Sequence, residues 1–130
     1  MRSSITLKEI PYVCGDYDAL NYCDVGADRN FEIIADDIYT IGHVYISEKT
    51  ETANGISCST YINWIEFLTI FSNKKLLRPT LEALCKMFGE LHLEASDKLV
   101  AKYESAGCKK IGIDDLTGLT VLKYEKSIIN

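Results

Sequence analysis

The 130-residue chain lacks several features that would place it in a special class. It has no apolar N-terminal run and no hydrophobic segment long enough to cross a bilayer, so we expect neither a secretory signal nor a membrane span. Basic residues are also in the minority, because 14 Lys and Arg stand against 19 Asp and Glu, a net charge of −5. This balance argues against a nucleic-acid partner and is compatible with a cationic substrate such as an amine.

The cysteines and histidines form no pattern of metal ligands. The five cysteines are far apart and odd in number, and none belongs to a C-x-x-C pair, so we expect neither zinc nor a disulfide framework. Cys85 lies among apolar residues at helical spacing and is expected to be a small core residue. His43 and His92 lie in strand-like segments without a ligand partner nearby. We therefore expect a reduced, cytoplasmic protein without a metal centre.

The length and the 47% of hydrophobic residues predict one domain, residues 1–130, with one core. Segments rich in β-branched and aromatic residues predict strands over 4–10, 31–35, 40–47, 56–71, 90–95, 109–113 and 119–125. Asp36 and Asp37 are expected at a hairpin turn. The segment 56–71 is too long for one flat strand and predicts a bulge or bend. Residues 12–30 predict turns with one short helix.

Two helices are expected in the second half. From Pro79 the apolar residues fall at helical spacing as far as Phe88, and Gly89 can end that helix. Ser96 is a suitable N-cap for a second helix with Leu99, Val100 and Tyr103 on one face and Gly107 as its left-handed end.

A crossover helix between the strands 56–71 and 90–95 makes these two strands parallel. The fold class is therefore α/β, or α+β, with a mixed, mostly antiparallel sheet and helices beside it.

This order of elements resembles the GNAT superfamily of N-acetyltransferases, best from Ile65 to Tyr124. Family members often carry Asn or Ser at the start of the last long helix, then Tyr seven residues on, then Gly-Phe. In "SDKLVAKYESAGC" that spacing is met by Ser96, Tyr103 and Gly107, with Cys108 in place of Phe. The resemblance implies that acetyl-CoA is the co-substrate and that it is held where two parallel strands splay apart. It also implies an acceptor amine on a small molecule or a protein. A homodimer is compatible with the resemblance.

The sequence departs from the family at the phosphate-binding junction. The family signature Q/R-x-x-G-x-G/A falls on "KLLRPT", residues 75–80, where Arg78 and Thr80 replace the two small residues. Glycines there let the backbone approach a pyrophosphate, and Pro79 removes one N–H. Lys74, Lys75 and Arg78 could instead supply charge directly. The segment before the hairpin is also short, so the acceptor cannot be named from the resemblance.

The resemblance implies roles for individual residues. Tyr103 would protonate the departing thiolate; the alternative is a Tyr that only packs on an amphipathic helix. Glu66 would accept the proton of the amine, although a solvated carboxylate is the commoner case. The co-substrate would pair with the backbone of Phe67 to Phe71, Leu68 and Ile70 among them, and contact the side chains of Lys75, Arg78 and Thr80. It would also contact Ser96, which can instead simply cap its helix.

The same observations leave a second function open. The missing glycines and the short N-terminal region fit a non-catalytic binding or structural protein that keeps the fold, such as a degenerate relative of phage or mobile-element type. In that case Tyr103 would have no chemical role.

Overall fold

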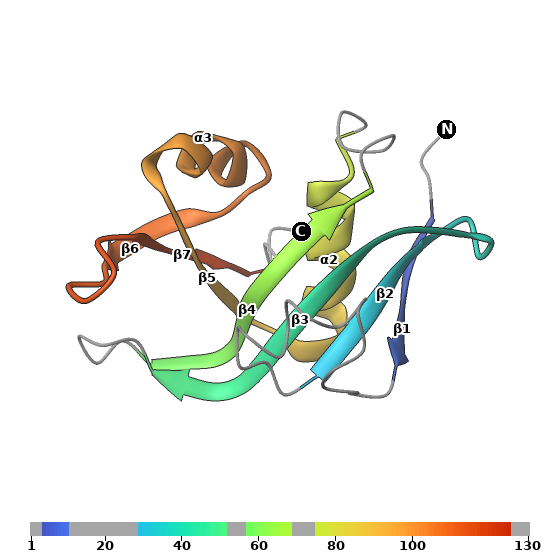
Figure 1. The fold of residues 1–130 in the computed structure, drawn as a ribbon, viewed down its shortest axis with the longest axis horizontal. Helices are drawn as coiled ribbons and strands as arrows, with labels where there is room; N and C mark the ends of the chain where they lie inside the picture. The colour runs from blue at the N-terminus through green and yellow to red at the C-terminus, as the bar shows by residue number, and fades with distance from the viewer. Residues whose placement is uncertain (1–3, 11–28, 52–56, 69–74, 126–130) are drawn as a thin grey trace, which may run out of the picture.

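The computed structural model describes residues 4–10, 29–51, 57–68 and 75–125. Its elements are β1 (Ile5–Ile10), β2 (Arg29–Ala35), β3 (Tyr39–Glu51), β4 (Ser57–Phe67), α2 (Leu77–Phe88), β5 (Leu91–Ala95), α3 (Asp97–Ser105), β6 (Lys109–Ile113) and β7 (Thr120–Tyr124) (Figure 1). The turns and short helix expected in residues 12–30 fall almost wholly outside the described residues. None of the described helices combines the length and apolar composition that crossing a bilayer requires.

The strands form one seven-stranded sheet in the order β1-β2-β3-β4-β5-β7-β6. Every neighbouring pair is antiparallel except β4 and β5, which are parallel. This confirms the predicted α/β class and the mixed sheet. The parallel pair is short, because only Tyr61 with His92 and Ile62 with Leu93 are in register. Beyond these pairs β4 and β5 diverge toward the top of Figure 1.

A β-bulge lies at the point where β4 leaves β5. In the β3–β4 ladder Tyr45 pairs with Trp64 and Ile46 pairs with Ile62, so Asn63 is the extra residue. A bulge of this kind bends its strand and increases its twist. The expected bulge is confirmed, and its position one residue after Ile62 explains why the pairing with β5 stops there.

The bulge also reverses which side chains of β4 face the core. Before it, Ile62 faces the core, and after it Ile65 and Phe67 do. The alternate residues Trp64, Glu66 and Leu68 are exposed on the opposite face of the sheet. The strand ends at Phe67 rather than at the expected Phe71, and residues 69–71 lie outside the described residues.

The β2–β3 hairpin turns at the predicted Asp-Asp pair. Asp36 and Asp37 have φ of 54° and 62°, and the Ile38 N–H donates to the Ala35 carbonyl at 3.1 Å. Two positive φ values in succession define a type I′ turn, whose twist matches that of the flanking strands. The Ser4 N–H donates to Asp36 Oδ1 at 3.0 Å and ties β1 to this turn.

Close approach of two strands explains Gly42. It pairs with Phe67, and a Cβ built on Gly42 would clash with the backbone carbonyl oxygen of Glu66. Only a residue without a side chain lets β4 lie this close to β3.

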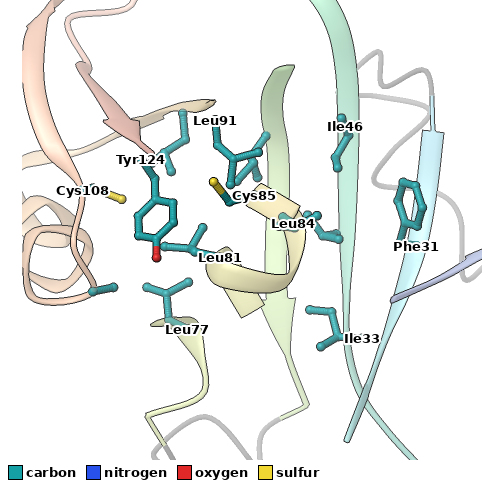
Figure 2. Packing of buried hydrophobic residues seen from close by; sticks show 14 of the residues in the cluster. Phe31, Ile33, Ile46, Leu77, Leu81, Leu84, Cys85, Leu91, Cys108 and Tyr124 are labelled. Atoms are coloured by element: carbon teal, nitrogen blue, oxygen red, sulfur yellow. The ribbon is translucent and has the colours of Figure 1, made fainter. Parts of the chain in front are cut away.

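The hydrophobic core lies on the α2 side of the sheet (Figure 2). Helix α2 contributes Leu77, Leu81, Leu84 and Cys85, which pack on residues of β2, β3, β4, β5 and β7. Figure 2 shows the Tyr124 ring between Cys108 and Leu81. Cys85 is therefore a core residue, as expected. The helix begins at Leu77, two residues before Pro79, and ends before Gly89, whose φ is 79°.

Helix α3 packs less deeply. Val100 and Tyr103 contact the core on the same side of the sheet as α2, whereas Leu99, one turn before Tyr103, is 43% exposed. The chain turns at Gly107, with φ of 110°, where the helix was expected to end.

Candidate functional site

The site expected from the sequence lies where β4 and β5 separate. Helix α2 follows β4, and α3 begins two residues after β5 ends. Both helices therefore follow the carboxyl ends of the diverging parallel strands, where the N-terminus of each helix carries partial positive charge. In α/β sheets that edge is the usual place for a ligand.

The residues before α2 adopt, without glycine, a backbone conformation that suits an anion. Lys75 is left-handed, with φ of 55°, and Leu76 is right-handed, with φ of −89° and ψ of −8°. Consecutive residues of opposite hand turn their N–H groups toward one side and create a concavity that suits an anion. Holding Lys75 there costs on the order of 1–3 kcal/mol. The first turn of α2 contains no acidic residue that would cancel its positive end.

Backbone donors precede the helical ladder of α2. The Thr80 N–H donates to the Leu76 carbonyl at 3.1 Å, so the N–H groups of Leu76, Leu77 and Arg78 come before that bond. Helix starts leave such donors for a cap or a ligand, and Leu76 provides no side-chain cap. Pro79 lies at the third helical position, where its missing N–H loses no helical hydrogen bond but removes one donor.

The side chains of the junction differ in their availability. Arg78 is exposed and its Nε lies 3.5 Å from Glu82 Oε1, so the guanidinium lies on the surface of α2. Lys75 is exposed. Thr80 is fully buried and its hydroxyl donates to the Leu76 carbonyl at 2.8 Å. Thr80 therefore has no group to offer a phosphate, which corrects its assignment from the sequence. Lys74 and Ile70 lie outside the described residues.

The backbone of β4 also corrects one assignment. The Leu68 N–H donates to the Ile41 carbonyl at 2.8 Å, so this amide belongs to the β3–β4 ladder and cannot pair with a ligand. Because amide groups alternate along a strand, those of Ile65 and Phe67 point away from β3, toward the side on which β5 has diverged. Phe67 begins the range expected to pair with the co-substrate, whereas Ile65 precedes that range, because the sequence does not locate the bulge.

Tyr103 lies on the α2 side of the diverging strands. It is half-buried, and burial raises the pKa of its phenol, with the nearby Cys108 as a smaller cause. The phenol is therefore protonated at neutral pH and can donate. Burial likewise raises the pKa of Cys108 to about 11, which keeps that thiol neutral.

Ser96 is the N-cap residue of α3 by its backbone alone. Its carbonyl accepts hydrogen bonds from the N–H groups of Leu99 and Val100, at 2.9 and 3.2 Å. Its side chain makes no capping hydrogen bond, contrary to expectation. The exposed hydroxyl remains at the start of α3, beside the end of β5.

A carboxyl cluster on the opposite face was not predicted. Glu94 of β5 accepts hydrogen bonds from the Tyr61 hydroxyl at 3.1 Å and from the Thr117 hydroxyl at 2.8 Å. Asp114 is buried, and its carboxyl is close enough to affect the pKa of Glu94. Burial raises the pKa of Glu94, the donors Thr117 and Tyr61 lower it, and Asp114 raises it again. The only local signal was the acidic residue in the alternating "LHLEA" strand.

His92 is the buried titratable side chain next to this cluster on β5. His92 is buried beside Glu90, with Nε2 and Oε1 3.5 Å apart, and burial lowers its pKa. No three His, Cys, Asp or Glu side chains gather as a metal site in the part of the chain that the structure describes. Glu66 is exposed on the same face of the sheet as Glu94.

Comparison with solved structures identifies the fold. No protein-family model matches the chain, and no curated protein sequence matches it. Its structure is similar to a chimera of the Vibrio cholerae spermidine N-acetyltransferase SpeG and hSSAT, with a TM-score of 0.62 and 15% identity over 95% of this chain and 96% of that chain. It is also similar to the dodecameric V. cholerae spermidine N-acetyltransferase, with a TM-score of 0.60 and 15% identity over 94% of each chain. A domain from Methanocaldococcus jannaschii has a TM-score of 0.63 and 12% identity over 96% of this chain and all of that one. The fold is GNAT-like.

Proposed function

We propose that the chain transfers an acetyl group from acetyl-CoA directly to an amine. The observation that carries this proposal is the divergence of β4 from β5 immediately after the Asn63 bulge, with the N-terminus of α2 at the open end. A GNAT-like fold with that opening offers backbone donors to the two polar parts of the co-substrate, its pantetheine amides and its phosphates.

The pantetheine arm would pair with the edge of β4. The amide groups of Ile65 and Phe67 are turned toward it, and an extended ligand can add to such an edge as a strand does. The hydroxyl of Ser96 lies just after the C-terminal end of β5, across the opening from β4, and can hydrogen-bond the arm.

The pyrophosphate would lie at the start of α2. The backbone N–H groups of residues 76–78 supply donors, and the left-handed Lys75 orients them as a glycine would. Lys75 and Arg78 add positive charge. The Arg78–Glu82 pair is exposed, and such pairs contribute only about 0–1 kcal/mol, so Arg78 can leave Glu82 for a phosphate at little cost.

The chemistry needs one proton acceptor and one proton donor. The amine nitrogen loses a proton to a carboxylate and attacks the thioester carbon, so a C–N bond forms and the C–S bond breaks. The phenol of Tyr103 donates its proton to the departing thiolate. Exposed Glu66 was the carboxylate expected from the sequence.

The acceptor is an amine whose identity is open. Spermidine is the first probe, because the similar V. cholerae enzymes act on it and this chain is acidic. A lysine-containing peptide and a peptide with a free N-terminus are the next probes. Since one similar structure is a dodecamer, we include self-association in the proposal, to be measured by light scattering.

Ligand-dependent melting tests the proposal. A ligand that binds only the folded chain stabilises it by about 2.7 kcal/mol at a hundred times its Kd. We expect acetyl-CoA and coenzyme A to raise the melting temperature, and acetyl-CoA with an acceptor to release free thiol. Binding without thiol release would favour the non-catalytic alternative, which the absent glycines motivate. A melting curve unchanged by millimolar acetyl-CoA and coenzyme A would reject the proposal.

A further inference from the structure

Glu94 occupies the place in the fold that a proton acceptor needs. It follows Leu93, the last residue of β5 in register with β4, so it lies at the start of the divergence. Leu93 and Ala95 face the core, and the alternation of β5 directs Glu94 to the opposite face. Tyr103 packs against the core side. A thioester held between the strands would therefore have the phenol on one side and this carboxylate on the other.

Two donors from different elements hold Glu94. Tyr61 of β4 donates to Oε2, and Thr117 of the β6–β7 loop donates to Oε1. A carboxylate with a hydrogen-bond donor on each oxygen keeps one orientation, so less conformational entropy is lost when it accepts a proton. Glu66 is different, because its exposed side chain forms no hydrogen bond or ion pair with any described residue.

The surroundings of Glu94 favour proton uptake. Asp114 is buried, and two neighbouring carboxyls do not readily ionise together, so one of them retains affinity for a proton. The Asp114 Oδ1 accepts the Leu116 N–H at 2.9 Å, which fixes it in its loop. Besides Glu66, the titratable groups His92, Glu90 and Lys123 lie on this face, where Glu90 contacts both His92 and Lys123 near the start of β5.

We propose that Glu94, held by the hydroxyls of Tyr61 and Thr117, and not Glu66, accepts the proton of the attacking amine. An N–H bond of the amine breaks and an O–H bond forms on Glu94, while the nitrogen lone pair forms the bond to the acetyl carbon. The thiolate takes the proton of Tyr103. This inference rests on the proposed acetyl transfer.

The test compares two conservative variants with the wild type. Thiol release is measured with acetyl-CoA and with spermidine or whichever of the two peptides is acetylated fastest. General-base catalysis contributes about 10²- to 10⁴-fold, so Glu94→Gln should lower kcat at least about a hundredfold. Glu66→Gln removes the rival carboxylate, and on this assignment it should lower kcat less than Glu94→Gln does. Both should bind acetyl-CoA as the wild type does.

Two further measurements separate chemistry from structure. Added formate should restore part of the activity of Glu94→Ala, because it supplies the missing carboxylate. Since Asp114 raises the pKa of Glu94, Asp114→Asn should move the acid limb of the kcat/KM profile to lower pH.

If the wild type is active and Glu94→Gln keeps full activity, the assignment of Glu94 is refuted while the proposed acetyl transfer stands. The same holds if Glu66→Gln loses activity and Glu94→Gln does not. Absence of thiol release from the wild type would instead refute the proposed acetyl transfer, and this inference with it.

Discussion

The hydroxyl of Tyr61 donates to Glu94 Oε2 at 3.1 Å and so joins β4 to β5 at their last point of contact. Two residues after Tyr61, the bulge at Asn63 bends β4 away from β5. The hydrogen bond therefore marks the apex of the divergence that the proposed site depends on. Because of this hydrogen bond, a change in the separation of β4 and β5 would alter the position of the Glu94 carboxylate.

The first prediction concerns stability and pH. The pKa of Glu94 is raised above its ordinary value of 4.5, so the folded chain binds this proton more tightly than the unfolded chain. Its contribution to stability is full below pH 4.5 and is lost as the pH rises through the raised pKa.

Glu94→Gln removes this titration. Urea unfolding between pH 4 and 8 should give curves for wild type and variant that converge at low pH, with the variant relatively more stable at neutral pH. Tyr61→Phe should enlarge the wild-type decline, because the Tyr61 hydrogen bond lowers the pKa. Parallel curves for wild type and Glu94→Gln would contradict this account.

The second prediction concerns Gly42. A methyl group there meets the Glu66 carbonyl, so Gly42→Ala must push β3 and β4 apart. Overpacking costs typically about 1–3 kcal/mol, and we expect a loss at the upper end because the obstacle is backbone. Gly118→Asn is the control, since its Cβ has open space and Asn tolerates a positive φ. Equal free energies of unfolding for the two variants would contradict the strand-approach argument.

Sequence reasoning succeeded where one segment determines its own structure. The Asp36-Asp37 turn, the helix ends near Gly89 and Gly107 and the existence of a bulge in β4 all follow from residues close together in the chain. The position of the bulge does not, because it depends on the register with β3.

What depends on that register, or on contacts between distant elements, could not be predicted. Two examples are the hydrogen bond from the Leu68 N–H to the Ile41 carbonyl and the burial of Thr80. The Glu94 cluster joins β4, β5 and the β6–β7 loop, and no local pattern indicates that Tyr61 and Thr117 meet there.

The third prediction addresses the phosphate junction. If Arg78 contributes a charged hydrogen bond to a phosphate, worth about 1.5–3 kcal/mol, then Arg78→Ala should weaken acetyl-CoA binding at least about tenfold. Lys86→Ala removes a charge from the last turn of the same helix and should have little effect. Isothermal titration at two salt concentrations measures both. Equal affinities for the two variants would assign phosphate binding to the backbone alone.

The fourth prediction concerns the cluster around Arg29, which lies away from the site. Its guanidinium bonds Glu9 at 2.8 Å and Glu48 at 2.7 Å, and it lies 5.2 and 5.1 Å from the ring centroids of Phe31 and Phe88. One side chain thus joins β1, β2 and β3 to the end of α2.

Arg29→Met should destabilise the chain by about 1–2 kcal/mol, since partly exposed ion pairs and cation–π contacts each contribute a fraction of that. Arg29→Lys should recover only part of this loss, because an ammonium cannot form the paired bonds to Glu9. Both are measured by urea unfolding. If Arg29→Met is as stable as the wild type, the contacts of Arg29 contribute nothing to the free energy of unfolding.

The most direct test of the central claim is thiol release by wild type and Tyr103→Phe in the presence of acetyl-CoA and an amine. We expect one thiol for each acetylated amine from the wild type. With a general acid removed, kcat should fall about 10²- to 10⁴-fold while acetyl-CoA affinity stays the same. A wild-type chain that neither binds acetyl-CoA nor releases thiol, or a Tyr103→Phe variant with undiminished kcat, would contradict the account.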